Sequence, residues 1–230
     1  MKLNLTKNSW DSEFFGKPIY TLKLDGTESN QQTEPGALIT AKIEGDDYAG
    51  IDRLNNLGFQ LCEGEVSFIK RLGPVDTKLS IEKYKAKQSD IEKLEALCSG
   101  LYSQSRFRMP WFSPSERDAF YSLWIRKAVN GEFDDVCLTI QDNGIIKGFV
   151  SVKIRGDVAK IGLIGVNEQF QGQGIGKKLI SLAEAYGALS NATLLSVATQ
   201  SSNRLAMLLY SKSNFTIQNI SYWFYKHAPF

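Results

Sequence analysis

The sequence is poor in the residues that form metal sites and disulfides. Its 230 residues contain one histidine, His227, near the carboxyl end, and three cysteines, Cys62, Cys98 and Cys137. A Ser-His-Asp or Cys-His arrangement needs an internal histidine, and zinc sites favour cysteines or histidines at short spacing. The cysteines are far apart and odd in number, so we expect neither a disulfide framework nor a metal site. A reducing compartment, the cytoplasm, fits this composition best.

Long apolar runs and a strong net charge are also missing. The chain has no run of about 18 apolar residues, and its first residues lack the apolar stretch of a signal peptide. The 27 basic and 25 acidic residues leave a formal net charge of +2. We therefore expect no membrane span and no general binding of nucleic acid, with positive charge acting only locally.

Glycine is concentrated in the segment VNEQFQGQGIGKKLI, residues 166–180. A β-branched stretch ends there, and an amphipathic helical pattern begins after a loop that contains Gly172, Gly174 and Gly176. Glycine lets the backbone approach a ligand closely, and free N–H groups at a helix N-terminus bind phosphate oxygens. Because Lys177 and Lys178 add positive potential at the same place, the segment predicts an anion site.

Spacing excludes two common phosphate loops. A Walker loop requires glycine at position 171 and serine or threonine at 178, where this chain has Gln171 and Lys178. A dinucleotide fingerprint requires G-x-G-x-x-G, and here the third glycine comes one residue early. The remaining pattern, Q-x-x-G-x-G between a strand and a helix, resembles the coenzyme A pyrophosphate loop of the GNAT N-acetyltransferase superfamily. The resemblance implies that acetyl-CoA is the co-substrate.

Turn signals and apolar periodicity predict an α/β protein in two parts. Gly73 and Pro74 mark a boundary, which divides the chain into a smaller α/β domain over 1–75 and a second domain over 76–230. The expected strands are 19–24, 37–43, 59–70, 79–86, 134–140, 145–154, 159–166, 194–199 and 216–226, and the expected helices are 46–57, 89–101, 116–129, 174–187 and 203–212. From residue 79 onward this is the element order of the GNAT fold with its mixed central sheet.

The two parts also resemble each other at an offset of 156 residues. At this offset the matching positions are Phe59 and Phe215, Phe68 and Phe224, Lys70 and Lys226, and the gap-free segments 46–57 and 202–213. Either residues 1–75 are a partial GNAT repeat without the phosphate loop, or both parts share this architecture by chance. If the repeat is genuine, we expect its function to be shaping the acceptor site.

Acetyl transfer requires a held thioester, a polarised carbonyl and a proton for the departing thiolate. The end of the strand before the loop can supply backbone groups to the pantetheine arm and to the developing oxyanion. Tyr210 follows Asn203 by seven residues, about two helical turns, so both face the same side. The resemblance implies that Tyr210 is the general acid and that Asn203 contacts the pantetheine arm; alternatively, Tyr210 only fills the core. The predicted coenzyme-binding residues are Ile164, Gly165, Val166, Gln171, Gly172, Gln173, Gly174, Ile175, Gly176, Lys177 and Asn203.

Residues 103–112, SQSRFRMPWF, are the candidate acceptor segment. Arg106 and Arg108 suit a diphosphate, and the aromatic rings around them, including that of Trp111, suit a base or a sugar ring. The same pattern is equally typical of a packed loop with solvated arginines.

Longer phrases distributed over nearly the whole chain resemble one group within the superfamily. These phrases are FFG at 14–16, LGFQLCEGEV at 57–66, SQSRFRMPWF at 103–112, FYSLWIRKAVNGEFDDVCL at 120–138 and VATQSSN at 197–203. The group is that of the dTDP-fucosamine acetyltransferases, and the resemblance implies acetylation of the 4-amino group of a dTDP-4-amino-4,6-dideoxy sugar for surface polysaccharides such as enterobacterial common antigen. It also suggests Glu63 as general base, with a solvent-facing Glu63 and a water chain as the alternative.

Two further functions remain open at this point. The acceptor can be a different amine, such as a protein N-terminus or a polyamine, or the chain can be a coenzyme A-binding module without catalysis. The aromatic-rich segment 221–230 either pairs with a second subunit in a homodimer or forms a buried strand.

Overall fold

The computed structural model describes residues 4–24, 33–74 and 80–229. Its strands are β1 (Asn4–Lys7), β2 (Ile19–Lys23), β3 (Leu38–Glu44), β4 (Gln60–Arg71), β5 (Val136–Asp142), β6 (Ile145–Arg155), β7 (Val158–Val166), β8 (Leu194–Gln200) and β9 (Thr216–His227). Its α-helices are α1 (Ser9–Phe15), α2 (Tyr48–Asn56), α3 (Ile91–Cys98), α4 (Pro114–Val129), α5 (Ile175–Leu189) and α6 (Arg204–Lys212). No helix within the described ranges is long and apolar enough to cross a membrane.

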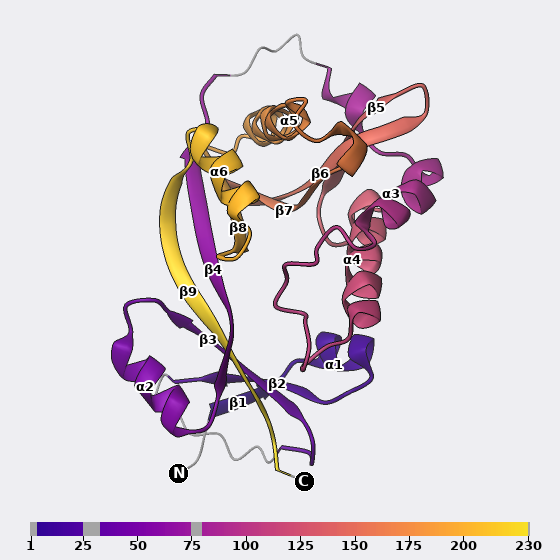
Figure 1. Cartoon of the computed structure of the whole chain (residues 1–230). Coiled ribbons are helices and arrows are strands. Elements are labelled where there is room, and N and C mark those ends of the chain that lie inside the picture. The colour runs from indigo at the N-terminus through magenta and orange to yellow at the C-terminus, as the bar shows by residue number, and fades with distance from the viewer. Residues whose placement is uncertain (1–3, 25–32, 75–79, 230) are drawn as a thin grey trace.

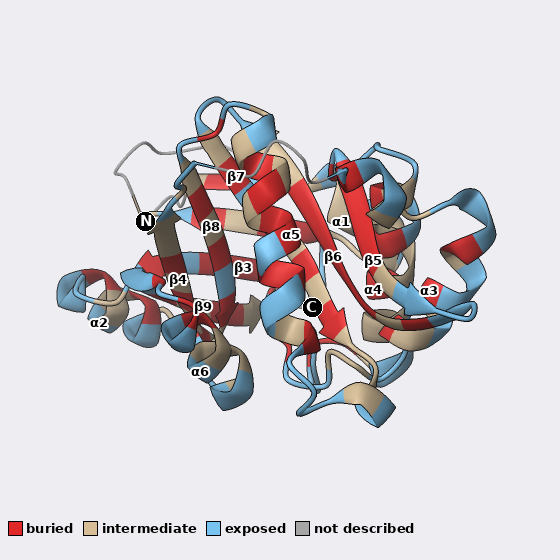
Figure 2. Ribbon diagram, turned by 90° about the horizontal axis from the view of Figure 1, so that it is seen from above, coloured by how far each residue is buried: buried red, intermediate tan, exposed pale blue. Residues whose placement is uncertain are grey.

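All nine strands lie in one mixed sheet, in the order β1-β2-β3-β9-β4-β8-β7-β6-β5 (Figure 1). The β2–β3 and β7–β8 pairs are parallel, and the other neighbours are antiparallel. Apolar side chains of β5 to β8 pack with α5 and α6 in one core, and those on the opposite face pack with α3 and α4 in another. Figure 2 shows the buried residues concentrated on the central strands and on the inner side of α5. The predicted α/β class with a mixed central sheet is therefore confirmed.

Local chemistry explains most element ends. Asn143 and Gly144 both have positive φ, 50° and 76°, which is the backbone of a type I′ turn joining β5 to β6. Ser113 begins α4 by accepting a hydrogen bond from the Glu116 N–H, and the Glu116 carboxylate accepts from the Ser113 N–H.

The predicted strand 79–86 is wrong. Leu79 lies outside the described residues, Ile81–Tyr84 form a 3₁₀ turn, and Lys85 makes one isolated bridge with Leu138. Ile81 and Tyr84 therefore pack into the core under α5 here without forming a continuous ladder.

The repeat is visible in the element bounds. Strand β3, helix α2 and strand β4 are matched by β8, α6 and β9, and every bound in the second set lies 156 residues after its counterpart in the first. Strand register repeats as well: Leu38 pairs with His227 in β3–β9, and Leu194 pairs with Arg71 in β8–β4. The two copies are thus related by an approximate twofold axis through the β4–β9 pair, near Glu65 and Ser221.

Each copy gives its last strand to the other. Strand β4, from the first copy, pairs with β8 of the second, and β9 of the second copy pairs with β3 of the first. The division at residue 75 stays a prediction, because residues 75–79 lie outside the described ranges, but both sides of it contribute strands to one continuous sheet. Strand β9 lies in the interior of the sheet, paired with β4 along most of its length and with β3 from Ser221 to His227. Pairing with a second subunit stays a prediction.

Candidate active site

The parallel strands β7 and β8 separate partway along their length. They pair only from Val158 to Ile161 and from Leu194 to Val197. Beyond that point β7 contains a bulge, in which Gly162 and Leu163 together lie opposite Ser151 of β6. Backbone groups on the β8 side of the β7 end therefore have no strand partner. One of them, the Ile164 carbonyl, accepts a hydrogen bond from the Tyr102 hydroxyl at 3.3 Å.

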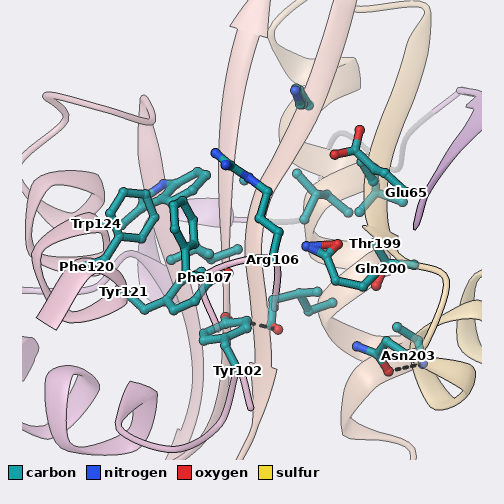
Figure 3. Close-up of a pocket in the computed structure, with 18 of the residues that line it drawn as sticks. Glu65, Tyr102, Arg106, Phe107, Phe120, Tyr121, Trp124, Thr199, Gln200 and Asn203 are labelled. Carbon is teal, nitrogen blue, oxygen red and sulfur yellow. Dashed lines mark hydrogen bonds between the residues drawn. The ribbon is translucent and has the colours of Figure 1, made fainter. Parts of the chain in front are cut away.

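A cavity of about 620 Å³ occupies this opening. Its lining comes from both cores, because Tyr210 and Val197 belong to the α5 side of the sheet and Phe107 and Tyr121 to the α4 side. Figure 3 shows the aromatic and charged side chains of the α4 side facing Thr199, Gln200 and Asn203 across this space. The cavity therefore passes through the sheet, so that two reactants can approach one point from opposite faces.

A buried carboxylate supports the bulge. Asp134 is 5% exposed and its Oδ2 accepts hydrogen bonds from Trp124 Nε1 at 2.9 Å and from the Ser151 hydroxyl at 2.6 Å. The Ser151 oxygen in turn accepts the Leu163 N–H at 2.8 Å. A side chain at Gly162 would collide with Asp134, because a Cβ there would lie 2.3 Å from Oδ2. This network fixes the strand end that borders the opening.

Tyr210 and Asn203 lie together at the α6 end of the cavity, as their spacing predicts. Asn203 caps α6 through its Oδ1, which accepts the Ala206 N–H at 3.1 Å, so its amide NH₂ remains for a ligand. Tyr210 is 2% exposed, and burial raises the pKa of its phenol above the ordinary value. A raised pKa keeps the phenol protonated at neutral pH, which is the form that can donate a proton.

The glycine-rich loop forms the N-terminus of α5. Gly172 and Gly174 have φ of 74° and 76°, and a Cβ at either position would meet nothing within 4 Å. The N-cap Gly174 provides no side-chain hydrogen bond to the first turn, whereas Asn203 caps α6 and Ser113 caps α4. The first amides of α5 are thus open to an anion. Gly176 has a different role, because a Cβ there would lie 3.0 Å from the Leu209 side chain of α6.

A further part of the cavity wall is formed by Lys42 and Glu65 of the first repeat, Trp223 of β9 and Arg106 of the loop before α4. Glu65 accepts hydrogen bonds from Lys42 Nζ at 2.6 Å and from Trp223 Nε1 at 3.0 Å. Burial acts to raise the pKa of Glu65, but these two donors outweigh it and the pKa is lowered. Arg106 lies 4.1 Å from the Trp223 ring and 4.2 Å from the Phe107 ring, and its guanidinium donates to the Tyr225 hydroxyl. This part of the wall is therefore aromatic and charged, with Glu65 as an anion and Lys42 and Arg106 as cations.

Four of the sixteen predicted site residues line the cavity, namely Ile164, Asn203, Tyr210 and Arg106, and the other twelve do not. These twelve are Gly165, Val166 and the loop residues 171–177, together with Arg108, Trp111 and Glu63, which bond or pack elsewhere. Arg108 donates to the Cys62 carbonyl from Nε at 3.2 Å and from Nη2 at 2.6 Å, which joins its loop to β4. Trp111 is buried against Tyr225. Glu63 accepts hydrogen bonds from the hydroxyls of Ser201 and Ser202 at 3.2 and 2.9 Å.

Comparison with known proteins decides the family. The profile of the Acetyltransferase (GNAT) family matches residues 101–215. A curated dTDP-fucosamine acetyltransferase from Escherichia coli O6:H1 is 33% identical over 225 residues, which cover 95% of this chain and 96% of that protein. This chain belongs to the GNAT acetyltransferase family. It is therefore an enzyme of a family that uses acetyl-CoA.

Solved structures of GNAT proteins share the fold at low sequence identity. A GCN5-related N-acetyltransferase from Sphaerobacter thermophilus is 12% identical, with a TM-score of 0.60 over 84% of this chain and 61% of that one. A GCN5-related N-acetyltransferase from Kribbella flavida is also 12% identical, with a TM-score of 0.56 over 100% of this chain and 88% of that one. The GNAT fold assignment thus has support from structure as well as from sequence.

Sequence reasoning missed several residues that line the cavity of this acetyltransferase. Among them are Glu65, which lies two residues after Glu63 in the same strand, and Asp134, which precedes β5 without any motif. Strand alternation places Glu63 and Glu65 on one face, but it does not indicate which of them turns toward the opening. Only the pairing of β4 with β9 brings Glu65 beside Trp223.

Proposed function

We propose that this enzyme transfers the acetyl group of acetyl-CoA to the 4-amino group of a dTDP-4-amino-4,6-dideoxyhexose of the fucosamine type. The observation that carries the proposal is the 33% identity to the E. coli enzyme across both repeats, combined with a cavity whose acceptor wall comes partly from the first repeat. The match covers 95% of this chain, so it includes the first repeat, which contributes to the acceptor wall, as well as the coenzyme-binding half. The product would serve the synthesis of a surface polysaccharide such as enterobacterial common antigen or an O-antigen.

The residues around the opening fit acetyl-CoA. The uncapped amides at the α5 N-terminus, with Gln171, Gly172, Gln173, Gly174 and Ile175, offer donors to the pyrophosphate, and Lys177 adds positive charge. From there, Gly176 packs α5 against α6 and thus brings the loop close to Asn203. The unpaired backbone of β7 at Ile164 and Val166, with Gly165 between them, can hold the pantetheine arm as an added strand would.

The reaction forms an N–C bond to the sugar amine and breaks the thioester C–S bond. Tyr210 donates its proton to the departing sulfur and recovers one from solvent or from the amine. Burial raises the pKa of Tyr210, and the same surroundings raise the pKa of a thiol formed beside it, so the transfer remains feasible. The amine must arrive unprotonated, and Glu63 is retained as the proposed base, reached through water. Glu65, whose lowered pKa keeps it ionised, suits the binding of the ammonium form.

A thiol-release assay tests the proposal. The purified enzyme is given acetyl-CoA with dTDP-4-amino-4,6-dideoxygalactose, its C4 epimer, the corresponding UDP sugars, spermidine and a peptide with a free N-terminus. We expect rapid release with a dTDP-4-amino sugar and background release with the polyamine and the peptide. Release with the polyamine or peptide, and none with any nucleotide sugar, would reject the acceptor class while leaving the acetyltransferase assignment intact.

A further inference from the structure

Three cations from the β6–β7 hairpin line the cavity. Lys153 and Arg155 lie at the end of β6, Lys160 lies near the start of β7, and all three line the cavity. Lys153 and Lys160 are directly opposite each other in the β6–β7 register. Two like charges facing each other across neighbouring strands destabilise a sheet unless an opposite charge joins them.

These cations point toward the acceptor side. Their strand neighbours Val152, Ala159 and Ile161 belong to the core under α5, and side chains alternate along a strand. Lys153, Arg155 and Lys160 therefore project from the opposite face, where α4 lies. Trp10 and Phe133 line the cavity on that face, with ring centroids 5.2 Å apart.

The cations have no ion-pair partner within the described part of the chain. The three nearest carboxylates in sequence are engaged elsewhere. Asp134 accepts from Trp124 and Ser151, Asp135 accepts the Ile154 N–H at 2.7 Å, and Asp157 accepts the Thr193 hydroxyl at 3.2 Å. Lys153 donates to the Phe133 carbonyl, which holds its ammonium group at the cavity wall. The three cations thus form no close ion pair in the described part of the chain, and the Asp11 and Asp134 carboxylates line the same cavity without pairing with them.

The arginines that the sequence suggested for a diphosphate are bonded to the protein. Arg108 is committed to the Cys62 carbonyl, and Arg106 is held between two rings and bonded to Tyr225. Lys160 lies four residues before Ile164 on β7, so about 13 Å of strand separates it from the bulged end. That interval leaves room for one sugar ring between the reacting amine and the phosphates.

We propose that Lys153, Arg155 and Lys160 form the site for the diphosphate of the acceptor. The inference rests on the proposed function, because it assumes that the acceptor is a nucleotide sugar. The diphosphate neutralises the facing lysines, the nucleoside lies along Trp10 and Phe133, and the sugar extends toward Ile164 with its amine at the opening. Specificity for a diphosphate-linked acceptor thus comes from the β6–β7 hairpin.

The experiment measures binding and turnover in an R155Q/K160Q variant, with K147Q as the matched control. Lys147 is also on β6, but it pairs with Asp142 outside the cavity. Titration with dTDP, with thymidine and with acetyl-CoA is followed by calorimetry. We expect the double variant to bind dTDP at least tenfold more weakly, to bind thymidine and acetyl-CoA as the wild type does, and to raise the KM for the dTDP-amino sugar at unchanged kcat. A thermal melt confirms that each variant is folded.

The outcomes separate the two proposals. Unchanged dTDP affinity in the double variant, no dTDP binding by the wild type, or an equal loss in K147Q would overturn the diphosphate site. A loss confined to acetyl-CoA would also overturn it, by assigning the cations to the coenzyme. If the double variant loses dTDP affinity as expected but the wild type acetylates no dTDP-amino sugar, the diphosphate site stands and the proposed reaction fails.

Discussion

The two repeats have the same backbone plan but different chemistry at matching positions. Helices α2 and α6 begin after Asp47 and Asn203, which both cap their helix by accepting an N–H three residues later. Asn203 retains an amide donor for a ligand, whereas the carboxylate of Asp47 has none. Seven residues further, Tyr210 lines the cavity and its counterpart Leu54 is fully buried in the core of the first repeat. The two helices are thus equivalent in structure, but the amide and the phenol that face the cavity occur only in the second repeat.

The repeats differ again where their sheets meet the ligand. In the second repeat β7 is bulged and followed by the glycine-rich loop and α5. In the first repeat β2 pairs with β3 in an unbroken register, and β3 is the next described element. The first repeat contributes Lys42 and Glu65 to the cavity wall and β4 to the sheet. The comparison indicates that strand exchange makes the first repeat part of the cavity wall.

The largest effect is expected at the position where the repeats differ most in chemistry. Tyr210→Phe removes the proton donor and keeps the ring, so we expect kcat to fall about 10²-fold with nearly unchanged acetyl-CoA affinity. Steady-state kinetics and a coenzyme titration measure the two quantities. The matched change in the first repeat, Leu54→Met, is expected to leave kcat unchanged and to cost less than about 1.5 kcal/mol of stability. Full turnover by Tyr210→Phe would show that this residue only packs.

A second difference is the open loop before α5. Gly174→Ala places a side chain at φ 76° beside the proposed pyrophosphate, and we expect the KM for acetyl-CoA to rise about tenfold because backbone and ligand are both displaced. Gly144→Ala is the control, since Gly144 has the same φ in the β5–β6 turn, away from the cavity. Equal kinetic effects in the two variants would mean that strain, and not the ligand, is responsible.

The bulge in β7 provides a third test. Asp134→Asn weakens the hydrogen bonds to Ser151 and Trp124 that hold the bulge, so we expect kcat to fall severalfold, by on the order of 1 kcal/mol in the barrier. Asp134 acts here as a positioning residue. Kinetics, by rapid quench or at steady state, measure its effect on kcat, and a thermal melt measures its effect on stability. A lowered melting temperature with unchanged kcat would limit Asp134 to stability.

The smallest expected effect is on the pH dependence of stability. Its source is the buried thiols, of which one lies in the first part of the chain and two in the second. Burial raises the pKa of Cys62 to about 11, and it raises the pKa of Cys98 and Cys137 as well. The unfolded thiols lose their protons above pH ~8.5 while the folded ones keep theirs, so the contribution of the thiols to the unfolding free energy is constant below that pH and falls above it. Urea denaturation at pH 7.5 and 9.5 measures the decrease. Removing one thiol with Cys98→Ala is expected to reduce the slope by about a third, and an unchanged slope would contradict this origin.

Local signals in the sequence predicted most elements because their causes are local. The Asn143–Gly144 turn acts within two residues, and the structure has the strands on either side of it near their expected positions. The failure at residues 79–86 has the opposite cause. An alternating pattern predicts a strand only if a partner is in register, and beyond the Lys85–Leu138 bridge no partner follows in the described chain.

The sequence by itself determined the family, the glycine-rich loop and the spacing of Asn203 and Tyr210, since all of these are patterns of neighbours or of whole-chain similarity. It suggested the 156-residue offset, and the element bounds of the structure showed that the two parts match. Only the tertiary structure decided that β4 and β9 exchange places, that Glu65 faces the cavity and Glu63 does not, and that Lys153 meets Lys160. The reason is that strand order and register bring together residues that are far apart in the chain. Which side chains then face a common space depends on the partner against which each strand is buried, and no local pattern encodes that partner.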